Sequence, residues 1–217
     1  MLYELSDIVA LVIVYNPSES VLGNFKTYLN SVSRLYIMDN SDDGIIRKWM
    51  EEFCEDKKIV YINNCGNKGI SYSLNFIIKN ISAKWILTMD QDSSFLDGMA
   101  TEFIYQAMSH NKFADEKNIY AYSAHNISEY GRATGLWYED KYAITSGCLL
   151  NVNIARNAGG VDEALFIDEV DFEFSWGCKK KGYKLFKYNK SIMMHTIGNV
   201  KNNKFTTLNF ESDFSYE

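Results

Sequence analysis

The residues best suited to chemistry follow one apolar stretch of the chain. Residues 85–89 read WILTM and are followed at once by Asp90, Gln91 and Asp92. Two carboxylates separated by one residue supply the hard oxygen ligands that Mg²⁺ and Mn²⁺ prefer, and phosphate oxygens often complete their coordination shell. A solvated acidic turn has the same composition. Because the triplet ends a predicted buried strand, we expect Asp90 and Asp92 to form a metal site.

A second group of carboxylates lies in residues 166–173, which read FIDEVDFE. Asp168, Glu169 and Asp171 alternate there with apolar residues, as expected where a loop leads into the first turn of a helix. Acidic side chains at that position stabilise a helix through its dipole, which is the simpler explanation. The alternative is a catalytic base, because a carboxylate beside a metal site and an apolar wall acquires a pKa suited to accepting a proton.

Two further segments contain residue types that suit phosphate or metal binding. His195 is one of three histidines and ends an apolar stretch, where it is either a metal ligand or a structural histidine. Gly66 and Gly69 flank Asn67 just before a predicted helix. Glycines at such a position let backbone amides approach a diphosphate, although a tight turn requires the same residues.

The elements that must position these residues alternate between strand and helix in the first half of the chain. Residues 8–14 (IVALVIV) form a continuous apolar run, which is typical of a strand buried on both faces of a parallel sheet. Such alternation predicts an α/β domain with a mostly parallel central sheet flanked by helices. Strands are expected at residues 8–14, 34–38, 58–62 and 84–89, and helices at about 18–30, 45–53 and 71–79.

Polar side chains gather where each of these four strands ends. The segments concerned are residues 15–16 (YN), 39–40 (DN), 63–64 (NN) and 90–92 (DQD). In open parallel sheets, ligands bind in the crevice outside the carboxyl ends of the strands. A single acidic residue after a strand is usually a turn former, but four polar strand ends together predict one binding crevice.

The second half of the chain has a looser pattern of elements. The sequence predicts helices at residues 98–109 and from 168 to 174, with a polar stretch at 128–140 between them. Strands are expected at residues 119–123, 143–152 and 184–188. No internal repeat or linker divides the chain, and we therefore expect a single domain.

Composition excludes several classes of protein. The chain has 217 residues, of which 47% are hydrophobic and 23% are charged, close to the average for a soluble globular domain. Its formal net charge of -6 argues against a surface that neutralises nucleic-acid phosphates, which requires clustered Lys and Arg. We therefore expect no nucleic-acid partner.

The cysteines and the apolar runs predict a cytoplasmic protein. The four cysteines contain no C-x-x-C pair, and a chain of this size needs no disulfides for stability, so free thiols in a reducing compartment are expected. The first residues lack the basic and apolar regions of a signal peptide, and no apolar run reaches the roughly 18 residues of a membrane span.

Five segments, taken in order, resemble glycosyltransferase family 2 and in particular its bacterial rhamnosyltransferases. The resemblance extends over about residues 8–198. It implies the GT-A fold, with a Rossmann-like sheet, for one catalytic domain at 1–217: a nucleotide-binding half to about 95, an acceptor half from 96 to 200, and a tail at 201–217. The segments are residues 14–17 (VYNP), 39–41 (DNS), 67–71 (NKGIS), 89–92 (MDQD) and 166–171 (FIDEVD).

The resemblance implies an inverting transfer of a sugar from a nucleotide-sugar donor, with dTDP-L-rhamnose as the leading candidate. On this basis Tyr15, Asn16 and Asp39 line the nucleotide pocket. Asn67 and Gly69 then lie beside the nucleotide and its diphosphate.

The same resemblance assigns the metal ligands. Asp90 and Asp92 position the diphosphate, Asp92 through Mn²⁺ or Mg²⁺, which neutralises the charge that develops on the leaving group. His195 corresponds to a region that supplies a further metal or diphosphate contact in some relatives.

For the catalytic base the resemblance points to the second acidic cluster. Asp168 is the first candidate, and Glu169 and Asp171 are the alternatives. The implied acceptor is a saccharide or a lipid-linked acceptor in the synthesis of surface polysaccharide at the cytoplasmic face of the membrane, which allows peripheral membrane association. Two other functions stay open: a nucleotidyltransferase and a non-catalytic nucleotide- or sugar-binding protein.

Overall fold

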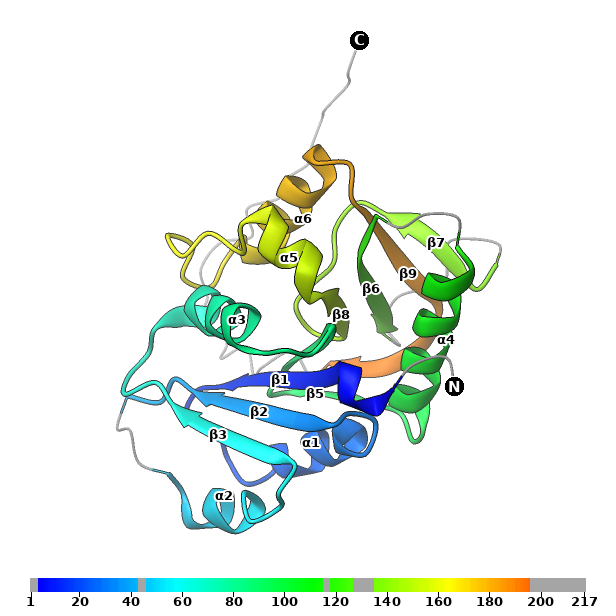
Figure 1. The fold of residues 1–217 in the computed structure, drawn as a ribbon. Helices are drawn as coiled ribbons and strands as arrows, with labels where there is room; N and C mark the ends of the chain where they lie inside the picture. Colours follow the sequence, from blue (N-terminus) through cyan, green and yellow to red (C-terminus); the bar gives the residue numbers. More distant parts are fainter. Residues whose placement is uncertain (1–3, 43–45, 115–117, 127–134, 196–217) are drawn as a thin grey trace, which may run out of the picture.

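A computed structural model describes residues 4–42, 46–114, 118–126 and 135–195 of the chain. Its first half is a parallel sheet, as the sequence predicts, and the strands lie in the order β3-β2-β1-β4. Figure 1 shows β3, β2 and β1 side by side. The 3₁₀ turn η1 (Leu5–Asp7) precedes the first strand. The four strands are β1 (Ile8–Val14), β2 (Arg34–Asp39), β3 (Ile59–Asn63) and β4 (Trp85–Asp90).

Helices cover both faces of this sheet. Alternate residues of β1 enter opposite cores: Val12 packs on the side of α1 (Val21–Leu29), and Leu11 packs on the side of α3 (Gly69–Asn80). The continuous apolar run of β1 is therefore buried on both faces, as predicted. The short helix α2 (Lys48–Phe53) lies on the same side as α1.

The second half of the sheet is mixed. After β4 the order continues β8-β6-β9-β5, and β7 pairs with β9 outside this path. Only β6 and β9 pair in parallel there, and the other contacts are antiparallel, so the sheet as a whole is mixed. The strands are β5 (Ser93–Phe95), β6 (Ile119–Asn126), β7 (Trp137–Asp140), β8 (Cys148–Asn151) and β9 (Lys184–His195).

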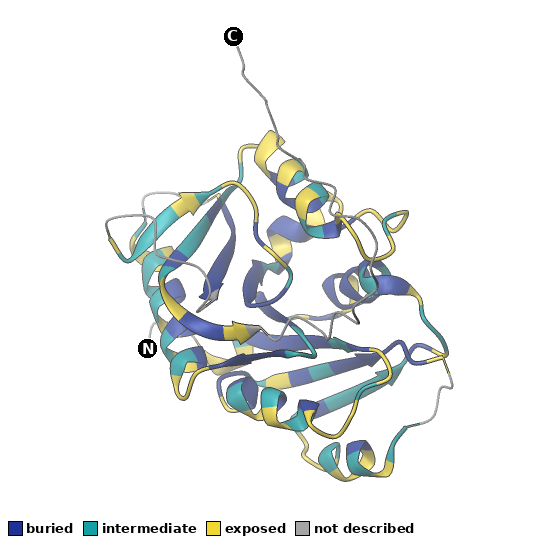
Figure 2. Cartoon of the chain, turned by 180° about the vertical axis from the view of Figure 1, so that it is seen from behind, coloured by how far each residue is buried: buried dark blue, intermediate teal, exposed yellow. Residues whose placement is uncertain are grey.

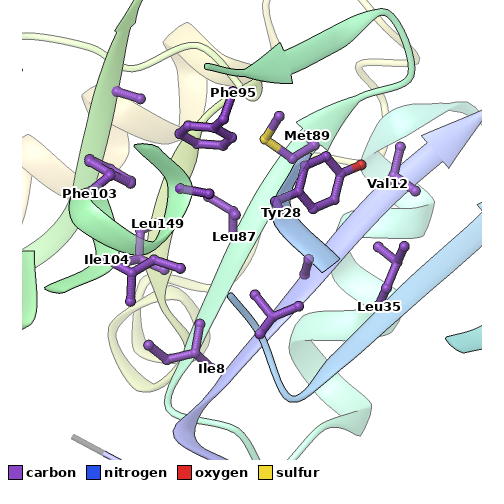
Figure 3. Packing of buried hydrophobic residues seen from close by; sticks show 14 of the residues in the cluster. Ile8, Val12, Tyr28, Leu35, Leu87, Met89, Phe95, Phe103, Ile104 and Leu149 are labelled. Atoms are coloured by element: carbon purple, nitrogen blue, oxygen red, sulfur yellow. The ribbon is translucent and has the colours of Figure 1, made fainter. Parts of the chain in front are cut away.

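Three helices complete the two outer layers. Helix α4 (Met99–Phe113) joins the core on the α1 side, whereas α5 (Val152–Ala158) and α6 (Val170–Lys180) join the core on the α3 side. Side chains of the core on the α1 side point toward one another between the strands and the helices (Figure 3). Burial is nearly complete along β1 and β4, whereas the outer side of α6 is exposed (Figure 2). None of the described helices is long and apolar enough to cross a membrane.

Two elements differ from the sequence prediction for identifiable reasons. Strand β7 lies within the polar stretch, where the ring of Trp137 packs 4.9 Å from that of Tyr188. Helix α5 begins inside the segment expected to be a strand, because the Asn151 side chain accepts a hydrogen bond from the Ile154 N–H at 3.1 Å and caps it. Tertiary packing therefore makes a strand of a polar segment, and a local cap starts a helix where the sequence pattern favours a strand.

Candidate active site

A cleft of ≈ 390 Å³ opens at the carboxyl ends of β1, β2 and β4. It lies at the sheet edge where the strand-end pattern predicts a binding crevice, although the fourth predicted strand end, residues 63–64 at the end of β3, does not line it. Five of the residues proposed from the sequence for nucleotide or metal line it together, namely Tyr15, Asn67, Gly69, Asp90 and Asp92. They come from the ends of two strands and from the start of α3.

Gln91 lies between Asp90 and Asp92, and its side chain binds this acidic turn to the end of β1. The Tyr15 N–H donates to Gln91 Oε1 at 3.0 Å, and Gln91 Nε2 donates to the Tyr15 carbonyl at 3.3 Å. Asn24 of α1 donates to the Gln91 carbonyl at 2.8 Å. The glutamine therefore continues the pairing of β1 with β4 past the end of the ladder and keeps the acidic turn over the sheet edge.

The sequence motif itself shows nothing of this contact, which joins side chain to backbone across 76 positions of the chain. Asn40 is a second lining residue, to which the sequence pattern assigns no role beyond its place in the polar strand end at 39–40. Its amide nitrogen donates to the Gly69 carbonyl at 3.1 Å, and its oxygen accepts from Asn64 at 2.8 Å. The polar pairs 39–40 and 63–64 were the available signal, because both end neighbouring strands.

Asp39, which the family resemblance places in the nucleotide pocket, is hydrogen-bonded to neighbouring groups in this structure, and its role toward a nucleotide stays a prediction. It is buried, and its two carboxylate oxygens accept hydrogen bonds from the Ser41 N–H at 2.8 Å and from the Tyr61 hydroxyl at 2.6 Å. Asn16 is exposed and donates its N–H to Ser41 Oγ at 2.9 Å. Neither residue lines the cleft. In the described arrangement both shape the loops that border it.

Tyr15 forms the outer edge of the cleft. Its hydroxyl donates to an Asp42 carboxylate oxygen at 2.6 Å, and this hydrogen bond, with the negative charge of Asp42, raises the pKa of the phenol. The ring is exposed on the molecular surface. A ring held at one end in this way provides a flat apolar surface at the mouth of the cleft.

The carboxylates of Asp90 and Asp92 fit a divalent cation that also binds phosphate. Both side chains are half-buried, and the Asp90 N–H donates to Ser146 Oγ at 3.2 Å. Within the described ranges, no three His, Cys, Asp or Glu side chains gather closely enough to hold a metal by themselves. Magnesium sites in nucleotide-binding enzymes commonly use one or two carboxylates, with phosphate oxygens and water completing the shell.

His195 is brought to the acidic turn by its backbone. It ends β9, where it pairs with Ser93 in the antiparallel ladder between β5 and β9. Ser93 directly follows Asp92, so the backbones of Asp92 and His195, the two residues predicted to bind the metal, lie close together. The side chain of His195 lies outside the part of the structure that is described, and its role as a ligand stays a prediction.

Gly69 allows the start of α3 to touch the loop that bears the second acidic cluster. Its φ is +80°, and a Cβ atom built there would lie 2.5 Å from the Phe166 carbonyl oxygen. The N–H groups of Gly69 and Ile70 bond to Asn67 Oδ1 at 3.1 Å and to the Phe166 carbonyl at 2.8 Å. Both amides are therefore used inside the protein, and Gly69 serves close packing at the cleft wall.

We expect Gly69→Ala to destabilise the fold by about 2–5 kcal/mol, the sum of a left-handed backbone penalty of ~1–2 kcal/mol and an overpacking cost of ~1–3 kcal/mol. The measurement is chemical denaturation. Gly23→Ala is the matched control, because Gly23 lies within α1 and nothing comes within 4 Å of its added Cβ. The control should gain up to about 1 kcal/mol from helix propensity. Equal stability of Gly69→Ala and wild type would contradict this account of the close contact.

Asp168, Glu169 and Asp171, the carboxylates of the second acidic cluster, lie in three different environments. Asp171 accepts hydrogen bonds from the backbone N–H of Thr145 at 3.0 Å and from the Thr145 hydroxyl. Burial raises the pKa of Asp171, and the bonds from Thr145 partly offset that rise. Glu169 has a φ of +66° and lines a second groove beside α6. Asp168 is exposed and directly follows Ile167, which lines the cleft.

Comparison with known proteins identifies the family of the chain. The model of the family described as Glycosyl transferase family 2 matches residues 10–159. A Shigella flexneri protein described as dTDP-rhamnosyl transferase RfbF is 24% identical over 210 residues, which cover 89% of this chain and 70% of that protein.

Solved structures of glycosyltransferases share the fold. GalNAc-T7 with UDP, GalNAc and Mn²⁺ superposes with a TM-score of 0.67 at 10% identity, over 87% of this chain and 43% of that one. The Pyrobaculum calidifontis mannosyltransferase PcManGT, in complex with GDP-Man and Mn²⁺, gives 0.66 at 13% identity, over 90% and 58%. The chain thus spans about half the length of these two structures.

These superpositions establish the GT-A fold that the sequence resemblance implies. The family model covers β1 to β8 and with them every lining residue of the cleft except Ile167. The chain belongs to glycosyltransferase family 2.

Proposed function

We propose that the chain is an inverting glycosyltransferase that moves L-rhamnose from dTDP-L-rhamnose to a hydroxyl of a saccharide or lipid-linked acceptor. The observation that carries the proposal is the cleft, which collects Tyr15, Asn67, Gly69 and the Asp90–Asp92 turn at one sheet edge. The choice of dTDP and rhamnose rests on the Shigella flexneri relative. The proposed place of action is the cytoplasm, at the inner face of the membrane.

Asp90 and Asp92 are proposed to hold Mn²⁺ or Mg²⁺ at the diphosphate end of the cleft. When bound, this cation supplies Lewis-acid stabilisation of the negative charge that develops on the leaving diphosphate. Tyr15 and Asn67 border the space left for the nucleotide. The hydrogen bonds between Gln91 and Tyr15 connect the proposed nucleotide-binding residue Tyr15 to the acidic turn. They thereby orient the nucleotide and the cation relative to each other.

Asp168 is proposed as the base of the transfer step. Its carboxylate accepts the proton of the acceptor hydroxyl, and the oxygen attacks the anomeric carbon of the sugar on the face opposite the diphosphate. The bond from that carbon to the diphosphate oxygen breaks, and its electron pair leaves with the nucleoside diphosphate. One displacement of this kind inverts the configuration at the anomeric carbon.

Asp168 is preferred to its neighbours because of where each carboxylate lies. Asp171 is engaged by Thr145, and a carboxylate that already accepts two hydrogen bonds from one residue is poorly placed to take a proton from a substrate. Glu169 lines the groove beside α6. Asp168 is exposed immediately after the cleft residue Ile167, where an acceptor can reach it.

The donor assignment is tested by the release of nucleoside diphosphate from a panel of nucleotide sugars. The panel contains dTDP-L-rhamnose, dTDP-glucose, UDP-glucose and GDP-mannose, each with Mn²⁺ and with water or added saccharide as acceptor. We expect dTDP-L-rhamnose to be turned over with the highest kcat/KM. Preference for another donor would overturn the rhamnose assignment and leave a glycosyltransferase; turnover of none would favour a nucleotide-binding protein without catalysis.

A further inference from the structure

A second groove, with a volume of ≈ 450 Å³, lies beside α6 and apart from the cleft. One wall is the exposed side of α6, where Phe172 and Trp176 are one helical turn apart. The other wall is the segment before β8, with Tyr142, whose ring centroid lies 4.6 Å from that of Phe172. Three aromatic rings therefore border one groove.

These rings are unusually open to solvent for side chains of their size. The exposed fractions are 59% for Trp176, 48% for Tyr142 and 43% for Phe172. The Nζ atom of Lys180 lies 3.2 Å from the centroid of the Trp176 ring and covers one face of it. This contact holds the indole in one orientation, so that a ligand stacking on the other face orders little additional side chain.

Charged groups of both signs lie between the rings. Glu169 and Glu173 supply carboxylates to the lining, and Lys141 and Lys179 supply ammonium groups. Flat apolar faces bordered by hydrogen-bond donors and acceptors match a sugar ring, whose C–H face is apolar and whose edge carries hydroxyl groups. A lipid surface would require a continuous apolar and cationic face, which the two carboxylates interrupt.

The groove and the cleft are separate, but neighbouring residues of one loop line them. Ile167 lines the cleft, Glu169 lines the groove, and the exposed Asp168 lies between them. The positive φ of Glu169 turns the chain at this point, so that consecutive side chains face different spaces. A saccharide that extends from the groove to the cleft would therefore pass the loop that carries Asp168.

We propose that the groove of Tyr142, Phe172 and Trp176 is a subsite for a sugar ring of the acceptor, stacked on the aromatic side chains and hydrogen-bonded by Glu169 and Glu173. The inference rests on the proposed function, because it makes the acceptor a saccharide of at least one ring beyond the reacting hydroxyl. On this inference, residues of α6 select the acceptor, and the residues at the ends of β1, β2 and β4 select the donor.

The test is a titration of ¹⁵N-labelled protein with methyl glycosides of glucose, galactose, rhamnose and N-acetylglucosamine and with their disaccharides. The Trp176 indole N–H signal, one of four such signals, is assigned with Trp176→Phe. We expect one or more saccharides to shift it saturably. Followed by the backbone amide signals of the same labelled protein, Trp176→Ala should bind saccharide about fivefold to tenfold more weakly, as the loss of a stacked aromatic contact predicts.

The control is Phe113→Ala, which removes another exposed aromatic ring on which a lysine packs, at the end of α4. It should leave saccharide binding unchanged. Binding of dTDP with Mn²⁺ is measured for every variant, and we expect it to be equal in wild type and Trp176→Ala. If the wild-type protein does not bind dTDP with Mn²⁺, the proposed donor is refuted, whereas the saccharide titration still decides the subsite.

Two results would overturn the subsite. In the first, no saccharide of the panel shifts the Trp176 signal, or Trp176→Ala binds saccharide as wild type does. In the second, Trp176→Ala loses affinity for phosphatidylglycerol vesicles but not for saccharide, which would make the groove a membrane-contacting surface.

Discussion

Asp168→Asn is expected to lower kcat for the release of dTDP from dTDP-L-rhamnose by about 10²–10⁴-fold, the usual contribution of a general base. The amide has nearly the shape of the carboxylate but cannot accept the proton of the attacking hydroxyl. Because Asp168 does not itself line the nucleotide cleft, binding of dTDP with Mn²⁺ should stay within about twofold of the wild type.

Asp162→Asn is the matched control for this variant. Asp162 is exposed in the same loop and accepts a hydrogen bond from the Ala164 N–H at 2.9 Å, which an asparagine oxygen can also accept. It should retain wild-type kcat. If Asp168→Asn also retains it, Asp168 is not the base, and the corresponding Glu169→Gln variant becomes the next one to measure.

Asp92→Ala is expected to weaken binding of dTDP in the presence of Mn²⁺ by at least about 100-fold. Replacing even an outer partner of a metal ligand commonly costs about 10–100-fold, and here a proposed ligand itself is removed. Turnover of dTDP-L-rhamnose should fall at least as much, because charge on the leaving diphosphate is then less well neutralised. Calorimetry and the dTDP-release assay measure the two effects.

Asp97→Ala provides the control for charge and position. Asp97 is exposed five residues further along the chain and does not line the cleft. Its replacement removes one negative charge from the same region and should leave dTDP binding unchanged. An Asp92→Ala protein that binds dTDP with Mn²⁺ as tightly as the wild type would exclude Asp92 as a metal ligand.

The parallel half of the fold and the position of the cleft could be predicted from the sequence. The apolar run of β1 is long enough to require burial on both faces, and each strand of this half ends in polar residues. Since parallel strands end at a common edge, those residues had to meet. The family resemblance then pointed to the GT-A fold before any contact was known.

The contacts within the cleft could not be predicted in the same way. Gln91 bonds to the backbone of Tyr15, and Asp39 bonds to Ser41 and Tyr61 and is not among the residues that line the cleft. A motif indicates which residue types are present but not which side chains are engaged by neighbours. The motif could not therefore distinguish a ligand-binding carboxylate from one that holds a loop.

The separation of Asp168, Glu169 and Asp171 likewise depends on backbone geometry. A helix beginning at residue 168 would place these carboxylates around its first turn, but α6 begins at Val170 after a residue with positive φ. Asp171 is thereby turned toward Thr145 in the interior. The groove beside α6 also depends on Tyr142, which is 30 residues before Phe172 and joins it only through tertiary packing.

The most direct test of the account is calorimetric binding of dTDP, UDP and GDP to the wild-type protein, each with Mn²⁺ and with a chelator. The cleft residues Asp90 and Asp92 predict binding that requires the cation, and the proposed donor predicts that dTDP binds most tightly. If no nucleotide binds with Mn²⁺, or if binding is equally tight with the chelator, the metal-dependent donor site proposed for this cleft is wrong.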